Sequence, residues 1–176
     1  MNEACVDGPV RNYVQTLDMQ DFVVETELFP EAALDAYSAW NTGKTLTADQ
    51  RRWISELRGG PQGNYREGMA KKIANVVDCL TKFPRSKRAV ISISNEPIPD
   101  HSNDADAKCV RELHLYLDDG GRLSGTLVLR AQATILFPKN IHMVGTIMTD
   151  IASQLPQRPA LGTLFYLATI LVADRS

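Results

Sequence analysis

Residues 112–129 decide the fold, and they read ELHLYLDDGGRLSGTLVL. Apolar residues occupy every second position from Leu113 to Leu117, and the alternation resumes from Leu123 to Leu129. Because successive side chains of a strand point to opposite faces, each half of this stretch places its leucines on one face. An aspartate followed by two glycines favours a tight turn between antiparallel strands. The stretch therefore predicts a β-hairpin with one leucine face.

Further strands and helices are predicted on both sides of the hairpin. Residues 89–94 alternate and are rich in β-branched side chains, and residues 164–172 form an apolar run typical of a buried strand. A helix over residues 65–82 is indicated by apolar residues at helical spacing, which are Met69, Ile73, Val76, Val77 and Leu80. Asn140 is placed to cap a second helix with a broad apolar face, made of Ile141, Val144, Ile147, Met148, Ile151 and Leu155.

The N-terminal part of the chain carries weaker signals. Residues 22–24, Phe-Val-Val, have the composition of a short strand. Pro30 is placed to begin a helix with one apolar face, made of Ala33, Ala36, Tyr37 and Trp40. Thr47 and Gln50 have the spacing of a capping box, which predicts a helix continuing toward Gly59 with an apolar face of Trp53, Ile54 and Leu57. The order of these elements predicts an α+β fold, with antiparallel pairing and helices on one face of the sheet.

Composition favours one globular domain over residues 1–176. Apolar residues make up 44% of the chain and charged residues 23%, and the net charge is -2. This balance gives no overall attraction to nucleic acid or to an anionic membrane, so neither is an expected partner. No apolar run approaches the roughly 20 residues that span a bilayer, and the first residues lack the pattern of a signal peptide, so we expect a cytoplasmic protein.

Generic motifs of catalysis and metal binding are missing from the sequence. It contains no phosphate-binding GxxxxGK[ST], no GxGxxG, no HExxH and no GxSxG. Three cysteines without CxxC spacing indicate neither a disulfide framework nor a zinc site. His101 lies among Asp100, Asp104 and Asp106, but acidic loops of this kind are usually only solvated, so we expect no metal site.

The second half of the chain resembles the thymidylate synthase family, which includes the pyrimidine-nucleotide hydroxymethylases. The resemblance rests on the order of four short stretches: residues 83–92 (FPRSKRAVIS), Cys109 at the head of a strand, Leu129-Arg130, and residues 137–141 (FPKNI) opening a helix. It runs over residues 66–173 and is clearest over residues 80–141. It implies a mostly antiparallel, twisted sheet with helices packed on one face, and a homodimer that pairs two sheets back to back.

The resemblance implies a cysteine nucleophile. Cys109 falls where the family places the thiolate that adds to C6 of a pyrimidine and makes C5 nucleophilic toward a one-carbon donor. Lys108 and Arg111 lie nearby in the sequence, and strand alternation places Arg111 on the side of Cys109 and Lys108 on the other. A buried structural thiol is the open alternative for Cys109. Cys79, between Val76 and Leu80 on a predicted helix, is expected to be buried.

The resemblance also implies nucleotide-binding residues. Arg130 matches the family's phosphate-binding arginine, and Lys87 and Arg88 match a pair that reaches the same phosphate across the dimer interface. Asn140 matches the asparagine that reads the pyrimidine edge with one donor and one acceptor. An exposed charge at a strand end and a helix cap remain the structural alternatives for Arg130 and Asn140.

Several family positions differ in this sequence. Val110 stands where thymidylate synthases have a histidine, and Ala131 and Ala133 replace a serine and an aspartate of the family. The last strand lacks the family's sugar-binding histidine and tyrosine, and the sequence up to Ser176 lacks the segment that closes the family's active site. Glu31 and Asp35 are candidates for the catalytic carboxylate, although a solvated helix face also explains both.

Two functions therefore remain open, beside a small interaction domain whose resemblance is coincidental. The first is a methylase or hydroxymethylase acting at C5 of a uracil or cytosine nucleotide, with a reduced folate such as methylenetetrahydrofolate as the implied cofactor and no metal. The second is a catalytically inactive nucleotide-binding or assembly subunit. Retention of Cys109, Arg130 and Asn140 favours the enzyme. The sequence does not identify the base, the sugar or the phosphate state.

Overall fold

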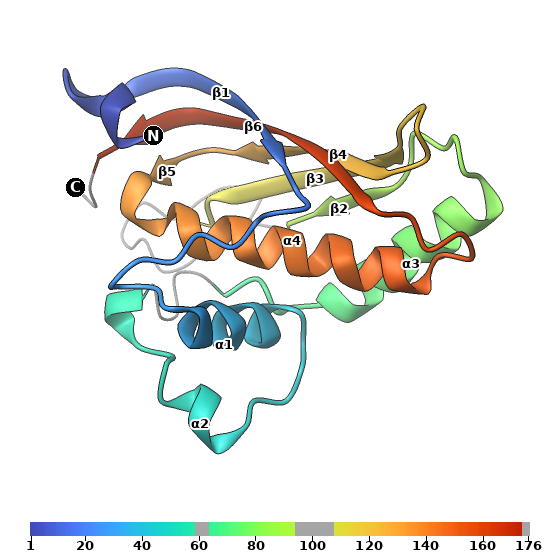
Figure 1. Ribbon diagram of the computed structural model, residues 1–176, viewed down its shortest axis with the longest axis horizontal. Helices are drawn as coiled ribbons and strands as arrows, with labels where there is room; N and C mark the ends of the chain where they lie inside the picture. Colours follow the sequence, from blue (N-terminus) through green and yellow to red (C-terminus); the bar gives the residue numbers. More distant parts are fainter. Residues whose placement is uncertain (59–63, 94–107, 174–176) are drawn as a thin grey trace.

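The computed structural model describes residues 1–58, 64–93 and 108–173 (Figure 1). The strands are β1 (Val10–Asp18), β2 (Val90–Ser92), β3 (Val110–Leu117), β4 (Leu123–Leu129), β5 (Gln132–Ala133) and β6 (Leu161–Val172). The helices are α1 (Glu31–Asn41), α2 (Ala48–Arg51), α3 (Met69–Lys82) and α4 (Phe137–Gln154), and the 3-10 turns are η1 (Asn2–Cys5), η2 (Glu56–Arg58) and η4 (Thr134–Leu136). The molecule is a mixed α+β fold.

The strands form one mixed sheet in the order β1-β6-β4-β3-β2, with β5 also paired to β6. The predicted hairpin is confirmed, because β3 and β4 pair antiparallel with Leu113 opposite Leu127 and Leu117 opposite Leu123. β6 pairs antiparallel with β1, but the prediction of antiparallel pairing is wrong for its contacts with β4 and β5, to which it runs parallel. The chain between β4 and β6 contains α4, and a helical crossover of this kind returns the chain in the same direction.

Helices cover one face of the sheet. In Figure 1, α4 runs beneath the sheet, and α1 and α3 both contact α4. The predicted apolar face of α4 is buried, and its residues Ile147, Met148 and Ile151 belong to the same core cluster as Leu127 of β4 and Tyr166 of β6. The alternation that placed the hairpin leucines on one face therefore also decided which face the helices cover.

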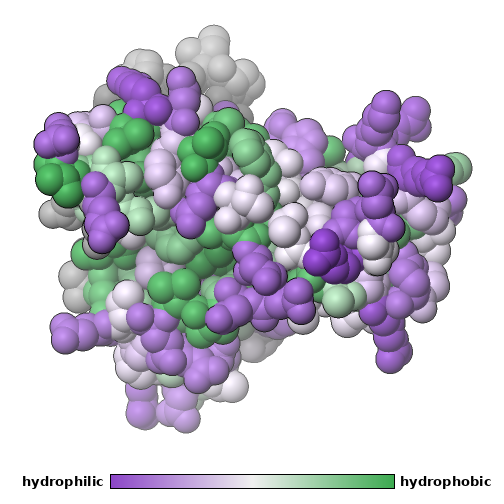
Figure 2. Space-filling view, turned by 45° about the horizontal axis from the view of Figure 1, so that its top comes forward, coloured by the Kyte–Doolittle hydropathy of each residue, from purple (hydrophilic) through white to green (hydrophobic). Residues whose placement is uncertain are grey.

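The opposite face of the sheet carries apolar side chains that no helix in the described ranges covers. Val14 on β1 is 51% exposed, and Tyr116 on β3 and Phe165 on β6 are each 41% exposed. Figure 2, in which the sheet side of the molecule is turned toward the viewer, shows apolar surface interrupted by polar side chains. No helix in the described part of the chain is long and apolar enough to cross a membrane.

The N-terminal strand differs from the prediction. Residues 22–24 form no strand, whereas β1 covers Val10–Asp18 and pairs antiparallel with β6. Phe22 instead packs on α4, where its ring lies 5.4 Å from the ring of His142, centroid to centroid. A side chain at Gly145 would overlap the Phe22 ring, so this glycine provides the space in which the phenyl ring lies.

Helix boundaries also differ from the predictions. The capping box of Thr47 and Gln50 is present, but α2 ends at Arg51 and only the short η2 follows it. The helix predicted over residues 65–82 begins at Met69, because Gly68 has a left-handed backbone with φ of 65°. Asn140 does not cap α4. That helix begins at Phe137 with Leu136 at the cap position, and Pro138 in its first turn needs no backbone hydrogen bond there.

Candidate functional site

Cys109 and Arg130 lie side by side at one end of the hairpin. Cys109 directly precedes β3 and is half-buried, and its carbonyl accepts a 2.8 Å hydrogen bond from the backbone N–H of Arg130. The Arg130 guanidinium donates through Nε to the Lys108 carbonyl at 3.3 Å. The hairpin ladder therefore brings together the candidate nucleophile and the candidate phosphate ligand. The alternation expected for Lys108 and Arg111 is interrupted, because the register between β3 and β4 shifts between Val110 and Glu112.

Tyr65 is a site residue that the sequence did not reveal. Its hydroxyl accepts a 3.3 Å hydrogen bond from the backbone N–H of Val110, directly after Cys109. Its own backbone N–H donates to Asn41 Oδ1 at 2.6 Å, so α1 fixes the segment before α3. Tyr65 was predicted to begin a helix, and nothing in its local sequence distinguished a pocket residue from a helical one.

Three buried tyrosines lie close to the Cys109 thiol. Burial raises the pKa of Tyr65 to about 12, and it raises the pKa of Tyr37 and Tyr166 as well. A negative charge on Cys109 raises the pKa of each of these hydroxyls further, while Arg130 lowers that of Tyr65. At neutral pH the three phenols are therefore uncharged and keep their hydroxyl protons.

Asn140 takes part in a buried amide network. Its Nδ2 donates to Gln132 Oε1 at 2.9 Å, and the hydroxyl of Tyr166 donates to the same oxygen at 2.9 Å. Asn140 Oδ1 is buried and has no hydrogen-bond partner in the described part of the chain. A buried acceptor without a partner costs about 1–3 kcal/mol, so this oxygen is a position where a ligand or water donor would bind. Gln132 was not predicted as a site residue.

Lys139 is a further buried residue of the site region. It is 2% exposed, its ammonium donates to the Arg58 carbonyl at 3.1 Å, and Nζ lies 4.6 Å from the centroid of the Tyr37 ring. A cation in the first turn of a helix is opposed by the helix dipole. The placement is therefore maintained by the specific contacts of Lys139 with Arg58 and Tyr37.

Lys72 and Lys108 lie close enough for their positive charges to interact. The pKa of Lys72 on α3 is lowered, first by burial and then by the charge of Lys108, with Glu67 opposing the shift. Lys108 is in turn the backbone partner of the Arg130 guanidinium. Cations held close together repel one another, and a bound anion would relieve that repulsion.

Lys87 and Arg88 lie at the other end of β3. The backbone N–H of Leu115 bonds to the carbonyl of Ala89, next to these two cations, whereas Cys109 precedes the first residue of β3. Strand geometry gives roughly 3.3 Å per residue, so about 20 Å separates the ends of this segment. The structure therefore does not bring Lys87 and Arg88 to the Cys109 site within one chain. A surface hollow of about 700 Å³ lies beside them, lined by Lys82, Phe83, Pro84, Arg85, Ser86 and Arg88.

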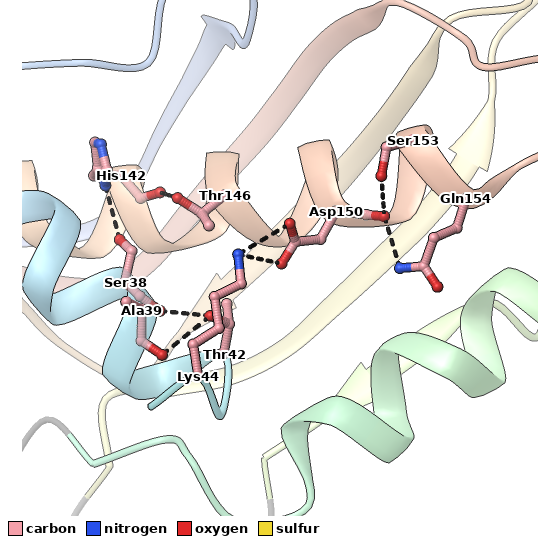
Figure 3. Close-up of polar contacts among 9 residues, drawn as sticks. All are labelled: Ser38, Ala39, Thr42, Lys44, His142, Thr146, Asp150, Ser153 and Gln154. Carbon is pink, nitrogen blue, oxygen red and sulfur yellow. Dashed lines mark hydrogen bonds and ion pairs between the residues drawn. The ribbon is translucent and has the colours of Figure 1, made fainter. Parts of the chain in front are cut away.

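Asp35 and Glu31 are not among the groups placed at Cys109. Asp35 Oδ1 lies 3.7 Å from His142 Nε2, and the side chain of Glu31 is exposed at the start of α1. His142 also shares a 2.7 Å hydrogen bond with Ser38 Oγ (Figure 3). Ser38 is 1% exposed, so this Ser–His–Asp arrangement joins α1 to α4 and does not present a nucleophile to a substrate.

The sequence predicted no metal site, and a folate was implied only by the resemblance. Asp100, His101, Asp104 and Asp106 lie outside the described residues, and within the described ranges no group of three or more potential ligands is found. A hollow against Tyr37 is lined by Trp40, Trp53 and Ile54, but its volume open to water is only about 10 Å³. That space holds at most one water molecule, so the described residues do not fit a folate there.

No protein-family model matches the sequence, and no curated protein matches it significantly. The folded chain is similar to thymidylate synthase from T4 phage, with a TM-score of 0.70 and 18% sequence identity. The matched region covers 93% of this chain and 66% of that enzyme, so the chain spans about two thirds of the enzyme's length. The likeness shows a thymidylate synthase-like fold, and function has to be argued from the site.

Proposed function

We propose that the protein binds a pyrimidine nucleotide and activates C5 of the base for one-carbon transfer, with Cys109 as the nucleophile. The observation that carries the proposal is the pairing of a half-buried thiol with Arg130 across two hairpin strands, next to three uncharged tyrosines. Thiol, guanidinium and phenol are the groups needed to attack a ring carbon, hold a phosphate and donate hydrogen bonds to the base.

The proposed chemistry begins with addition of the Cys109 sulfur to C6. The C5–C6 double bond opens, and its electron pair moves to C5 and the adjoining carbonyl. C5 then takes up an electrophile and gives up its original proton to water. The sulfur leaves as the double bond forms again. Neutral hydroxyls of Tyr65 and Tyr37 are suited to donate hydrogen bonds to the enolate oxygen, because their raised pKa keeps them protonated. The one-carbon electrophile is not assigned to the hollow against Tyr37, because that hollow is too small for a folate.

Phosphate binding is proposed for the cationic side of the site. Arg130 is the central ligand, and Lys108 and Lys72 add charge next to it. A phosphate there would add charge-assisted hydrogen bonds to these cations. Lys87 and Arg88 join this site only from a second copy, which we propose to pair through the uncovered face of the sheet.

A second candidate function is a nucleotide-binding or assembly subunit without catalysis. The observation that favours it is the position of Asp35, which faces His142, and of Glu31, which is exposed. Neither supplies a carboxylate for proton transfer at Cys109. The two candidates predict the same nucleotide binding and differ in whether C5 reacts.

Hydrogen exchange at C5 distinguishes the two candidates without any carbon donor. Uridine and cytidine monophosphates, in ribo and deoxyribo forms, are incubated with the protein in D₂O, and the C5–H signal is followed by proton NMR. The enzyme proposal expects loss of that signal with the native chain and no loss with Cys109→Ser. Binding of a nucleotide without exchange supports the binding subunit, and absence of any binding rejects both.

A further inference from the structure

Lys72 and Lys108 are half-buried lysines that form no ion pair within residues 1–58, 64–93 and 108–173. Burial and the charge of Lys108 lower the pKa of Lys72, and the exposed Glu67 opposes this shift only in part. By contrast, Lys82, whose side chain is 62% exposed, pairs with Asp78 at 2.7 Å. A cation removed from water without a partner costs more free energy than an exposed one. Lys72 and Lys108 therefore need an anion more than Lys82 does, and no described carboxylate is paired with them.

The two lysines and Arg130 belong to one basic cluster at the head of β3. Lys108 lies two residues before β3 begins, and its carbonyl accepts a 3.3 Å hydrogen bond from Arg130 Nε. Lys72 lies in the first turn of α3. The segment that leads into α3 is attached at the same place, because the Tyr65 hydroxyl accepts a 3.3 Å hydrogen bond from the backbone N–H of Val110. Three parts of the chain therefore bring their cations to one end of the hairpin.

The basic cluster has more cationic groups than a single phosphate needs. The guanidinium of Arg130 has the planar fork that binds one phosphate group through two parallel hydrogen bonds. Lys72 and Lys108 then remain, and an ammonium group binds phosphate as a point charge. Each further phosphate in a nucleotide chain adds negative charge and oxygen acceptors beyond the first phosphate. A chain of phosphates therefore supplies partners to the two lysines from the same ligand.

We propose that the site takes a nucleoside di- or triphosphate, with the first phosphate on Arg130 and the following phosphates on Lys108 and Lys72. This inference rests on the proposed nucleotide-binding function and narrows its substrate class. A monophosphate held by Arg130 leaves the two lysines as they are in the free chain, half-buried and mutually repelling. A longer phosphate chain converts that repulsion into charge-assisted hydrogen bonds.

The test measures the ratio of triphosphate to monophosphate affinity, because a general loss of structure weakens both nucleotides. Dissociation constants of UMP, UDP and UTP, and of the three cytidine nucleotides, are measured by calorimetry in the presence of EDTA. The chelator removes divalent cations, which would otherwise neutralise the phosphate chain. For either base, the native chain should bind the triphosphate at least about tenfold more tightly than the monophosphate, as expected for one additional charged hydrogen bond.

Variants of Lys72 show whether the cluster is the source of this ratio. Lys72→Gln removes the charge, so the ratio should fall by at least about threefold while the monophosphate affinity is retained. Lys72→Arg keeps the charge and should keep most of the ratio. Lys71→Gln makes the same charge change at an exposed position of α3, and it should leave the native ratio intact. If Lys72→Gln does not fold, Lys108→Gln makes the same test.

The outcomes separate this inference from the function on which it rests. A triphosphate that binds no more tightly than the monophosphate overturns the inference and leaves the nucleotide site standing, as does a ratio that Lys72→Gln and Lys108→Gln both retain. Inorganic tripolyphosphate that binds as tightly as UTP also overturns it, because the cluster would then bind an anion without a nucleoside. Failure of the native chain to bind any of the nucleotides overturns the proposed function and this inference together.

Discussion

The backbone N–H of Arg130 donates a 2.8 Å hydrogen bond to the carbonyl of Cys109, so the two central residues of the site are joined by the hairpin ladder. Their separation is therefore set by strand pairing and does not depend on side-chain conformation. The backbone positions from which the thiol and the guanidinium extend are therefore preorganised for a ligand that needs both groups.

The first prediction concerns cysteine reactivity. Cys109 should react with iodoacetamide faster than Cys5, which is 5% exposed, and faster than Cys79, whose Sγ donates to Ser86 Oγ at 3.2 Å. The expected burial of Cys79 is only partly met, since its side chain is half-buried. Mass spectrometry of the native protein after brief labelling measures the three rates. Equal labelling would count against an activated Cys109.

The second prediction concerns the phosphate ligand. Arg130→Ala should weaken uracil and cytosine monophosphates by the same factor, because the guanidinium contacts the phosphate and not the base. Asn140→Asp should instead change the ratio between the two bases. Calorimetry on both variants distinguishes the effects. If both variants unfold more easily but keep the native affinities, these residues are structural and the site assignment is wrong.

The hairpin and α4 were predictable because their own patterns decide their structure. Leu113 and Leu115 alternate at strand period, and the apolar residues of α4 recur at helical period. β1 was missed because most of its side chains are exposed, and only Val10, Tyr13 and Leu17 are half-buried. Its pairing with β6 also depends on a segment more than 140 residues away in the sequence.

The sequence predicted only those site residues whose own side chain carries the proposed chemistry. Cys109 and Arg130 were found because a thiol and a guanidinium at those positions resemble a known arrangement. Tyr65, Gln132 and Lys139 were not, because their roles depend on contacts with residues distant in sequence, such as Val110 for Tyr65 and Arg58 for Lys139. The assignment of Asn140 as a cap failed because Phe137 and Pro138 already begin the helix.

The third prediction concerns pH. The pKa of His142 is lowered by burial, and Asp35 opposes the shift only in part. The unfolded chain, with the ordinary value of about 6.5, then binds more protons than the folded chain as the pH falls. The contribution of His142 to stability is fully present above about pH 6.5 and is lost as the pH falls toward the folded value.

Urea unfolding at pH 8, 6.5 and 5 measures this contribution. The His142→Gln variant should lose less stability than the native chain over the lower interval. The same substitution at His114, half-exposed on β3, controls for the loss of an imidazole as such. An equal pH dependence in the native chain and His142→Gln would show that His142 is not the titrating group.

The fourth prediction concerns the contact between Phe22 and α4. A Cβ at Gly145 would overlap Cγ of Phe22, so Gly145→Ala must displace the ring. Overpacking of this kind costs about 1–3 kcal/mol, while alanine gains up to about 1 kcal/mol of helix propensity. Gly145→Ala should therefore lower the free energy of unfolding. In a Phe22→Ala background the same change should raise it, as measured by urea denaturation. A loss of similar size in both backgrounds would place the clash elsewhere.

The fifth prediction concerns assembly. The sheet face opposite the helices exposes Val14, Tyr116 and Phe165, and soluble monomers rarely expose large apolar patches. Lys87 and Arg88 lie at the far end of β3 from Cys109, so they reach a nucleotide only if a second copy supplies them. We expect a symmetric homodimer in which the Arg88 side chain of one protomer contacts the phosphate held by Arg130 of its partner. Light scattering at micromolar concentration measures the mass.

Mixing two variants that each bind nucleotide weakly tests whether the two protomers share the phosphate site. A dimer of one Arg88→Ala chain with one Arg130→Ala chain has one pocket that lacks both arginines and one pocket that keeps both. Mixed dimers should therefore recover nucleotide binding in about half of their sites, which is about one quarter of all sites when the chains exchange freely. Each variant alone should bind weakly, because every pocket in its dimers lacks one arginine. Recovery requires chain exchange, which a tagged and an untagged chain reveal by co-purification. A mixture that exchanges chains and recovers no binding would place both arginines in the same protomer's pocket or outside the site. A monomeric mass by light scattering would exclude the shared site altogether.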